Sequence, residues 1–244
     1  MNILILDKGE RECFLPRGDR RADHILTVLR KGPGDELAAG CPDGAVGSAR
    51  ITAAGPEGVA LSFTPEGQAP ALHPVVVLLG FPRPIQARRI LKDLASLGVS
   101  RVVLCATELG EKSYMKSDLV AKGEYLALVR EGAEQSANPR LMAVDTAWTL
   151  ARGLAALGPA TAGGRRWCLD PYKAGGMFGS APIQASPDDP AILAIGSERG
   201  WTPGELRALE AAGFAFARLG SRILKTETAA TAAVAISLSR LGLG

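Results

Sequence analysis

The sequence predicts a small β-barrel or β-sandwich followed by an α/β domain with a largely parallel sheet. In about the first 65 residues, short apolar runs alternate with turns rich in glycine and proline, which is typical of an antiparallel β-domain. From residue 74 onward, uniformly apolar strand-like runs alternate with helical patterns, as expected for parallel strands buried on both faces. The segment 64–73 contains Pro65, Gly67 and Pro70 and is the best linker candidate, so we assign the domains to residues 1–72 and 73–244.

The expected strands of the first domain cover residues 2–6, 37–39, 45–53 and 59–63. They are separated by the turn signals Gly-Pro-Gly, Pro-Asp-Gly and Gly-Pro-Glu-Gly. One helix interrupts them, because five apolar residues recur at helical spacing and should share one side: Ala22, Ile25, Leu26, Val28 and Leu29.

The expected strands of the second domain cover residues 75–80, 102–105, 166–169, 191–195 and 215–219. Helix 85–97 should stop at Gly98. A second helix should begin at Thr202, which forms a capping box with Glu205, and should end at Gly213. A last helix runs from about Thr226 almost to the carboxyl terminus.

The composition is that of a packed globular protein, with 47% hydrophobic and 22% charged residues in a chain of 244. The net charge of +3 is too small to indicate nucleic-acid binding through the overall field. Any surface that binds a nucleic acid must therefore be a local basic patch.

The sequence does not predict a metal site, a secretion signal or a membrane span. The four cysteines, Cys13, Cys41, Cys105 and Cys168, lie far apart without a C-x-x-C pair, and His24 and His73 are the two imidazoles. The amino terminus becomes charged after six residues, unlike a signal peptide. The longest apolar run, near residues 74–81, is far below the ~20 residues of a membrane helix. We therefore expect a cytoplasmic protein.

Two segments place glycine and polar residues directly after expected buried strands, where an open α/β sheet holds its ligands. The first covers residues 195–200 and the second covers residues 219–229. Glycine allows a backbone to approach a ligand closely, although an isolated Gly-x-x-x-Gly is more often an ordinary strand-to-helix turn. Neither segment contains the G-x-G-x-x-G or G-x-x-x-x-G-K-[ST] pattern, so a dinucleotide fold of the Rossmann type and a P-loop lose their main support.

These residues resemble the RsmE family of small-subunit ribosomal RNA uracil-N3 methyltransferases, within the SPOUT superfamily. The resemblance covers nearly the whole chain and is most specific at Gly-Ser-Glu-Arg-Gly (196–200), at the Trp-Thr-Pro-x-Glu helix start, and at Leu-Gly-x-Arg-Ile-Leu-Lys-Thr-Glu-Thr-Ala (219–229). In the first domain it rests on His-Ile-Leu-x-Val-Leu-Arg (24–30), Gly-Asp (34–35) and Asp-Gly (43–44). The chain departs from the usual family pattern at four positions: Ser197, Arg199, Ser221 and Lys225.

The resemblance implies a PUA-like β-barrel for RNA, followed by an α/β SPOUT methyltransferase domain with a C-terminal trefoil knot. It further implies S-adenosyl-L-methionine as the cofactor, a uridine of 16S rRNA or of the small ribosomal subunit as the substrate, and a homodimer formed through the SPOUT domain. No metal is required. Topology rules alone would have favoured an unknotted sheet, because true knots are rare.

In such a domain three loops surround the cofactor, and here they map to residues 168–170, 195–200 and 219–224. The cofactor-binding residues implied are Leu169, Ile195, Gly196, Gly200, Leu219, Gly220, Ile223 and Leu224. Backbone contacts should dominate, which makes the three glycines the strongest candidates.

The residues expected to carry the chemistry are Glu198, Arg222 and Lys225. The two cations would stabilise negative charge on the uracil oxygens while the methyl group is transferred. Glu198 is a base or a substrate-orienting carboxylate; a capping or ion-pair role is as well supported, because sequence cannot establish burial.

A local basic patch lies in residues 17–31, and from it we selected Arg17, Arg20, Arg21, His24 and Arg30 as RNA-binding candidates. Arg88 belongs to a second cluster, where Lys92 lies four residues later and an anion is needed to relieve the like charges. A solvated helix face explains the first cluster as well, and an acidic side chain explains the second. Core or interface packing is the commoner role of Trp148, Trp167 and Trp201, so we assign them no function.

Three other hypotheses stay open on the sequence. The first is methylation of another RNA position, and the second is a catalytically silent RNA-binding or ribosome-assembly protein. The third is an α/β oxidoreductase, which the missing glycine fingerprint disfavours. Binding of S-adenosylmethionine against NAD distinguishes the last from the methyltransferase.

Overall fold

The chain divides into two compact units in a computed structural model that describes residues 1–7, 9–159 and 166–243. Unit 1 comprises Met1–Ala71 together with Ala133–Leu141. Unit 2 comprises Leu72–Gly132 together with Met142–Gly244.

Unit 1 contains a five-stranded sheet in the order β1-β3-β4-β5-β2. Its strands are β1 (Leu4–Ile5), β2 (Glu12–Pro16), β3 (Glu36–Gly40), β4 (Ala45–Gly55) and β5 (Gly58–Gln68). β1 is parallel to β3, and the other neighbours are antiparallel. At the β4–β5 turn, Gly58 has a φ of 145°, and a Cβ there would collide with the Leu15 carbonyl of β2, so this turn requires glycine.

The expected amphipathic helix of unit 1 takes a different form. The helix α1 (Arg20–Asp23) passes into the π-helix η1 (His24–Leu29). Because a π turn is wider than an α turn, the spacing of the apolar residues changes along it. Ala22 and Ile25 are buried, whereas Val28 is 63% exposed and Leu29 is 37% exposed. The prediction of one continuous apolar face was therefore wrong at its carboxyl end.

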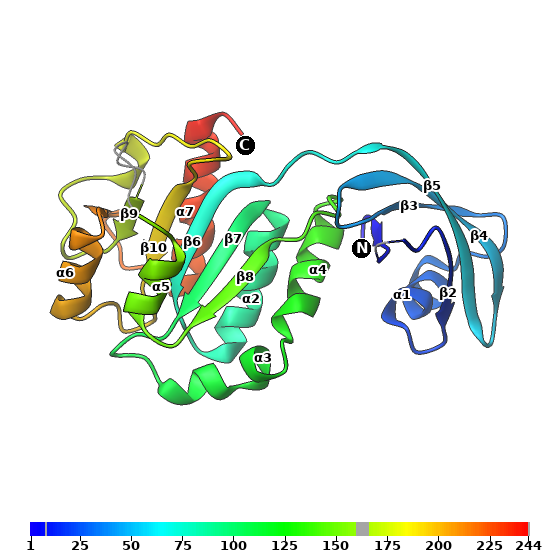
Figure 1. Ribbon diagram of the computed structural model, residues 1–244, viewed down its shortest axis with the longest axis horizontal. Helices are drawn as coiled ribbons and strands as arrows, with labels where there is room; N and C mark the ends of the chain where they lie inside the picture. Colours follow the sequence, from blue (N-terminus) through cyan, green and yellow to red (C-terminus); the bar gives the residue numbers. More distant parts are fainter. Residues whose placement is uncertain (8, 160–165, 244) are drawn as a thin grey trace. The chain divides into compact units, whose positions relative to one another are not determined.

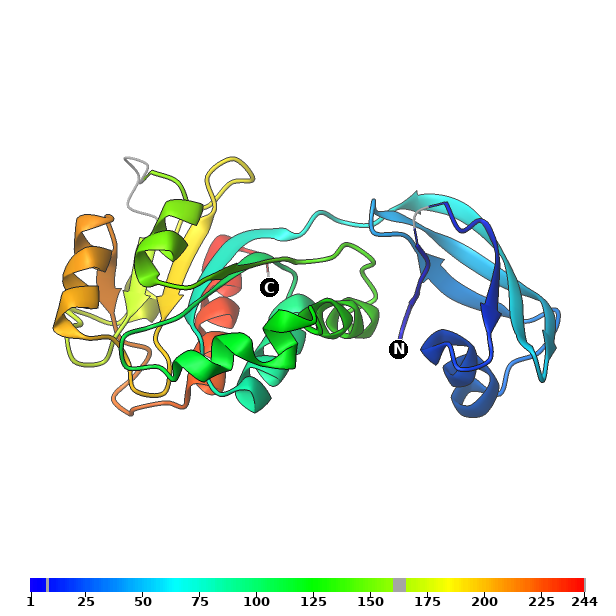
Figure 2. The ribbon, with the colours of Figure 1, turned by 60° about the horizontal axis from the view of Figure 1, so that its bottom comes forward.

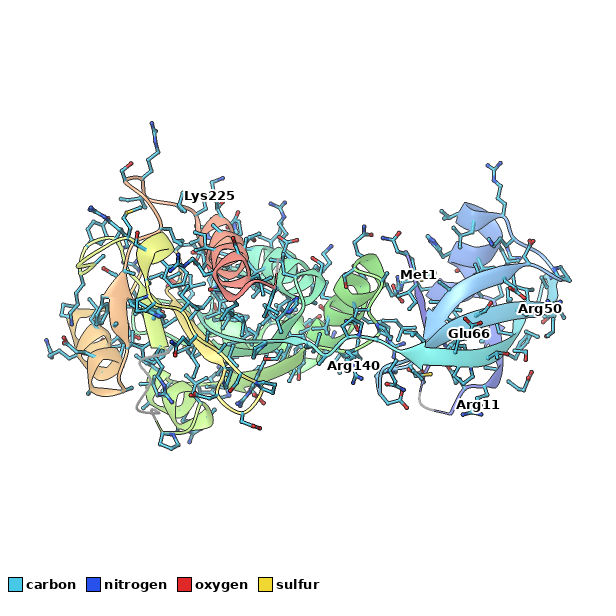
Figure 3. All side chains as sticks on the ribbon, turned by 90° about the horizontal axis from the view of Figure 1, so that it is seen from above. Met1, Arg11, Arg50, Glu66, Arg140 and Lys225 are labelled. Atoms are coloured by element: carbon cyan, nitrogen blue, oxygen red, sulfur yellow. The ribbon has the colours of Figure 1, made fainter. Side chains whose placement is uncertain are left out.

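Residues 133–141 pack in unit 1, which the sequence did not predict. The carbonyl of Glu134 accepts a hydrogen bond of 2.8 Å from the backbone N–H of Asn2, and its buried carboxylate pairs with Arg20 at 2.6 Å. Arg140 (Figure 3) donates to the carbonyl of Ala69 at 3.3 Å. A contact between segments so far apart in sequence leaves no local pattern to detect.

Unit 2 contains a six-stranded sheet in the order β11-β9-β10-β6-β7-β8, and all of its neighbours are parallel (Figure 1). Its strands are β6 (His73–Gly80), β7 (Val99–Cys105), β8 (Ala143–Ala147), β9 (Arg166–Leu169), β10 (Ala191–Ile195) and β11 (Ala215–Ala217). The chain first builds outward from β6 to β7 and β8. It then returns to the other side of β6. There β9 comes first, β10 is inserted between β9 and β6, and β11 is added outside β9.

Helices cover both faces of this sheet (Figure 2). One face carries α5 (Leu150–Ala156) and α6 (Pro203–Ala211), and the other carries α2 (Pro84–Ser96) and α7 (Thr226–Leu241), which pack on each other. The connecting helices are η2 (Lys112–Lys116), α3 (Asp118–Ala121), α4 (Tyr125–Gln135) and η3 (Phe178–Ser180). This arrangement confirms the predicted α/β class with a parallel sheet.

Most predicted elements of unit 2 occur where the sequence places them. The bounds of β9 and β10 match the prediction, and β11 ends two residues earlier than expected. The capping box is confirmed, since the Thr202 hydroxyl accepts from the Glu205 N–H at 3.1 Å and the Glu205 carboxylate accepts from the Thr202 N–H at 2.9 Å. Two edge strands, β2 and β8, were missed: β8 carries Asp145 and Thr146 within its five residues, and β2 has a short apolar stretch that ends at Pro16.

Candidate active site

The parallel register brings the three predicted loops to one edge of the unit 2 sheet. Leu79 of β6 pairs with Ile195 of β10, which pairs with Leu169 of β9, which in turn pairs with Ala217 of β11. All four strands end there, next to the point where the strand order changes direction between β6 and β10. An open α/β sheet holds its ligand at such a point.

A cavity of about 670 Å³ opens at this edge, which is a suitable size for a small organic ligand. All eight predicted cofactor residues line it: Leu169, Ile195, Gly196, Gly200, Leu219, Gly220, Ile223 and Leu224. Glu198, Arg222 and Lys225 line it as well. The structure therefore gathers into one cavity the residues that the sequence analysis had placed on three separate loops.

The loop 196–200 is a tight turn closed by a hydrogen bond of 2.9 Å from the Gly200 N–H to the Ser197 carbonyl. Gly200 has a φ of 70°, where glycine costs least. A Cβ on Gly196 would lie 3.0 Å from the Gly200 Cα. These two glycines are therefore explained by the turn itself.

Gly220 differs from the other two glycines. A Cβ placed on it would meet no protein atom within 4 Å, and its φ is outside the left-handed region. Neither packing nor backbone conformation requires glycine at this position. A ligand that approaches the backbone closely would explain it.

Two further loops complete the wall of the cavity. The buried Asp170 carboxylate accepts from the backbone N–H of Tyr172 at 2.9 Å and of Lys173 at 2.7 Å, which closes the turn after β9. The N–H of Phe178 donates to the Arg218 carbonyl at 2.9 Å, which ties η3 to the chain that enters loop 219–225. Asp170 lies in the predicted loop 168–170, but the sequence analysis did not name its side chain, although a carboxylate directly after a buried strand is a readable signal.

Gln86 of α2 is a second missed residue. It lines the cavity, and its Oε1 atom is buried without a hydrogen-bond partner among the described residues. A buried acceptor normally has a donor. A donor on a bound ligand, such as an amino or imino group, would satisfy this atom.

Glu198 forms a hydrogen bond to the backbone of the residue that precedes α2. Its exposed side chain accepts a hydrogen bond of 2.8 Å from the backbone N–H of Arg83, the residue that precedes α2. This bond joins loop 196–200 to the amino terminus of a helix 115 residues away.

The mouth of the cavity is basic. Five exposed cationic side chains line it: Arg83, Arg199, Arg218, Arg222 and Lys225. Lys225 lies where the exposed loop enters α7 (Figure 3). Within the described part of the chain none of the five forms an ion pair within 4.0 Å, so their charge is available to an anionic ligand.

The RNA-binding candidates of unit 1 are in different environments. Arg17 and Arg30 are exposed, and His24 is partly buried. Arg20 is half exposed but paired with Glu134. Arg21 is held by Asp19 at 2.9 Å and by Glu10 at 3.0 Å, with its side chain 13% exposed. Arg21 therefore stabilises unit 1, and we leave it out of the proposed RNA surface.

The second basic cluster is neutralised within unit 2. Arg88 forms an ion pair with Glu124, and Lys92 pairs with Glu131 at 3.7 Å. Acidic side chains near and on α4 thus supply the anions that the like charges on α2 require. Arg88 has no free charge to offer, so we leave it out of the RNA surface too.

No group of three or more potential metal ligands occurs in residues 1–7, 9–159 and 166–243. The four cysteines are free thiols. None of the helices described is both long and apolar enough to cross a membrane.

The fold and the site define a class of protein. It is an α/β domain with a parallel sheet, a cavity at the strand ends and basic side chains at the mouth of that cavity. The family model described as an RNA methyltransferase domain matches residues 69–238. A protein of Treponema pallidum named ribosomal RNA small subunit methyltransferase E is 37% identical, over 98% of this chain and 91% of that protein. The chain belongs to the ribosomal RNA small subunit methyltransferase E family, as the resemblance predicted.

A further sequence relative agrees with this membership, and a solved structure agrees with the fold. Ribosomal RNA small subunit methyltransferase E 1 of Borreliella burgdorferi is 26% identical, over 99% of this chain and 99% of that protein. The crystal structure of ribosomal RNA small subunit methyltransferase E from Neisseria gonorrhoeae, bound to S-adenosyl methionine, superposes with a TM-score of 0.78. That chain is 20% identical, with 99% of this chain and 98% of that chain covered, and the likeness establishes the fold.

Proposed function

We propose that this protein methylates N3 of a uridine in small-subunit ribosomal RNA, with S-adenosylmethionine as the methyl donor. Family membership supports the reaction class and the RNA. The cavity at the strand ends, with Gly220 facing open space, is the single observation that carries the cofactor assignment.

The residues of the cavity fit this cofactor. Leu169, Ile195 and Leu219 supply apolar walls, and the backbone at Gly220 is open to close approach. The unpartnered Oε1 of Gln86 can accept from an amino group. When bound, the cofactor supplies an activated methyl group on a sulfonium.

The basic mouth serves the nucleotide. The N3–C bond would form as the C–S bond of the sulfonium breaks, and the N3 proton would pass to water at the exposed mouth of the cavity. Negative charge would spread to the neighbouring uracil oxygens as this proton leaves. Arg222 and Lys225 are exposed cations on the loop that lines the cavity, and they stabilise this charge. Holding the base against the donor in one orientation supplies much of the remaining rate.

Glu198 acts as a positioning residue in this scheme. Its hydrogen bond to the Arg83 N–H holds loop 196–200 against the start of α2. The carboxylate thereby fixes the wall of the cavity on which the cofactor lies.

Unit 1 is the PUA-like barrel of this proposal, and Arg17, Arg20, His24 and Arg30 contact RNA. Unit 2 is the SPOUT domain with its trefoil knot. The pairing of Met177 with Arg218 supports the knot, because a loop after β9 lies against the chain just before it continues into α7. The exposed Ile85, Ile223 and Leu224 support a homodimer through this domain, since apolar side chains near a cavity mouth suit an interface.

The first test is calorimetric titration of the purified protein with S-adenosylmethionine, beside the variant Gly220→Trp, which fills the cavity. Gly32→Trp is the matched control, because a Cβ at Gly32 also meets no atom within 4 Å and lies in unit 1. Micromolar binding that is lost only in Gly220→Trp is the expected result. Failure of the wild type to bind would leave a catalytically silent RNA-binding protein as the better description. Mapping the methyl group on rRNA then tests the N3 position.

A further inference from the structure

A second cavity, of about 600 Å³, lies at the same edge of the unit 2 sheet but beyond β7 and β8. Gly80 of β6, Cys105 of β7 and Ala147 of β8 are in register, so these strands end at the same level as those of the first cavity. The lining residues that matter here are Thr107, Glu108, Lys112, Lys116, Trp148 and Glu205. The cofactor proposal uses none of them.

One wall separates the two cavities. The hydroxyl oxygens of Thr107, which lines the second cavity, and Ser197, which lines the first, lie 3.3 Å apart and are both buried. The Thr202 hydroxyl donates to the Glu108 carboxylate at 2.6 Å, next to the same wall. The two cavities therefore share this wall, with Ser197 lining one side of it and Thr107 lining the other.

The chemistry of the second cavity suits a nucleotide. Trp148 is 48% exposed on its wall, which offers an aromatic face for stacking. Lys112 and Lys116 lie on successive turns of the short helix η2 and are both exposed. In the described ranges neither ammonium has an acidic partner within 4.0 Å, in contrast to Lys92 and Lys122.

The two carboxylates of the cavity are already engaged. Glu205 is 4% exposed, and its oxygens accept from the backbone N–H groups of Glu108 and Thr202, both at 2.9 Å. Glu108 accepts from the Thr202 hydroxyl. A phosphate would therefore be repelled from the Glu108 side and attracted to the lysine side, which gives a bound nucleotide one orientation.

We propose that the second cavity binds a nucleotide of the RNA substrate that flanks the target uridine, with its base stacked on Trp148 and its phosphates on Lys112 and Lys116. The inference rests on the proposed function, because the ligand is a neighbour of the methylated base. Unpaired bases that stack on aromatic side chains are the usual targets of sequence-specific RNA recognition. The cavity thus selects the RNA segment, while the first cavity holds the cofactor.

The test uses the full-length protein, S-adenosylmethionine, protein-free small-subunit rRNA that lacks the modification, and intact small subunits. The variants are Trp148→Ala, Trp148→Phe and the double variant Lys112→Ala with Lys116→Ala. Lys122→Ala is the control, because Lys122 is a nearby lysine already paired with Asp118 at 2.9 Å. Thermal unfolding of each variant confirms that it folds.

We expect Trp148→Ala to weaken rRNA binding about 5- to 150-fold, the range found for loss of one stacked base, and Trp148→Phe to restore most of it. The lysine double variant should reduce the slope of log K against log salt by roughly 1.4, since each single-strand phosphate contact contributes about 0.7. The dissociation constant for S-adenosylmethionine should not change in any variant.

Three outcomes overturn the proposal while leaving the proposed function intact. Wild-type rRNA affinity in Trp148→Ala would exclude stacking, and an unchanged salt slope in the double variant would exclude the phosphate contacts. Weaker binding to intact subunits with normal binding to protein-free rRNA would assign the cavity to a protein partner. By contrast, a wild-type protein that binds rRNA but transfers no methyl group contradicts the proposed function and leaves this binding site standing.

Discussion

The carboxylate of Glu198 and the backbone N–H of Arg83 are joined by a hydrogen bond of 2.8 Å, which connects the glycine loop after β10 to the start of α2. Both residues line the cavity at the strand ends of unit 2. The loop and the helix are therefore positioned together, and Glu198 has a structural contact that a free general base would lack.

Replacing Glu198 separates positioning from proton transfer. Glu198→Gln keeps an acceptor oxygen for the Arg83 N–H and should retain S-adenosylmethionine affinity and kcat within about 3-fold. Glu198→Ala loses the acceptor and should weaken cofactor binding by about 10-fold, as expected for a lost charge-assisted hydrogen bond. Calorimetry and single-turnover methylation measure the two quantities. A large loss of kcat in Glu198→Gln with unchanged affinity would instead identify a base.

Replacing Gly80 by alanine and replacing Gly220 by alanine should have different effects on stability and cofactor affinity. A Cβ on Gly80 would lie 2.7 Å from the Ser197 backbone nitrogen, so Gly80→Ala must displace loop 196–200 and lower both the melting temperature and cofactor affinity. A Cβ on Gly220 meets no protein atom, so Gly220→Ala should keep the melting temperature and lower only the affinity. Calorimetry measures the cofactor affinity of each variant, and thermal unfolding measures the melting temperature of each. An affinity unchanged in Gly220→Ala would remove this glycine from the cofactor site.

Arg166 is a buried structural cation of unit 2. It is 6% exposed, and its guanidinium donates to the carbonyls of Gly158 and Pro159 at 2.7 Å and of Ala212 at 3.2 Å, beyond the ends of α5 and α6. Arg166→Met should reduce the free energy of unfolding by about 2–4 kcal/mol, because three carbonyls lose a charged donor. Denaturant unfolding measures this loss, with Arg152→Met on the exposed side of α5 as the control. Equal stabilities of the two variants would contradict the assignment.

His24 should make stability depend on pH. Burial of the imidazole lowers its pKa from 6.5, and the positive charges of the amino terminus and Arg20 act in the same direction against Glu134. The folded protein then binds fewer protons than the unfolded chain in the window just below 6.5, so the free energy of unfolding should fall as pH decreases through that window. His24→Gln should lack this component. Urea denaturation between about pH 7.5 and pH 5.5 compares the two proteins, and superimposable pH profiles would count against the prediction.

The sequence by itself determined the elements whose signals are local. The apolar runs of β9 and β10, the capping box of Thr202 and Glu205, and the glycines after the strands all depend on residues within a few positions of one another. Parallel pairing then places the ends of buried strands at one edge, which is why residues that line one cavity could be named from three separate loops.

Only the tertiary structure decided which polar groups are unpaired and can therefore bind a ligand. Arg21 and Arg88 were chosen as RNA ligands from their charge, but Arg21 is paired with Asp19 and Glu10, and Arg88 is paired with Glu124, 36 residues further along the chain. Gln86, the Glu198 contact and the cavity beside Trp148 likewise depend on segments that meet only after folding. Burial and ion pairing are properties of the packed molecule, because they are set by distances between segments that a local pattern does not contain.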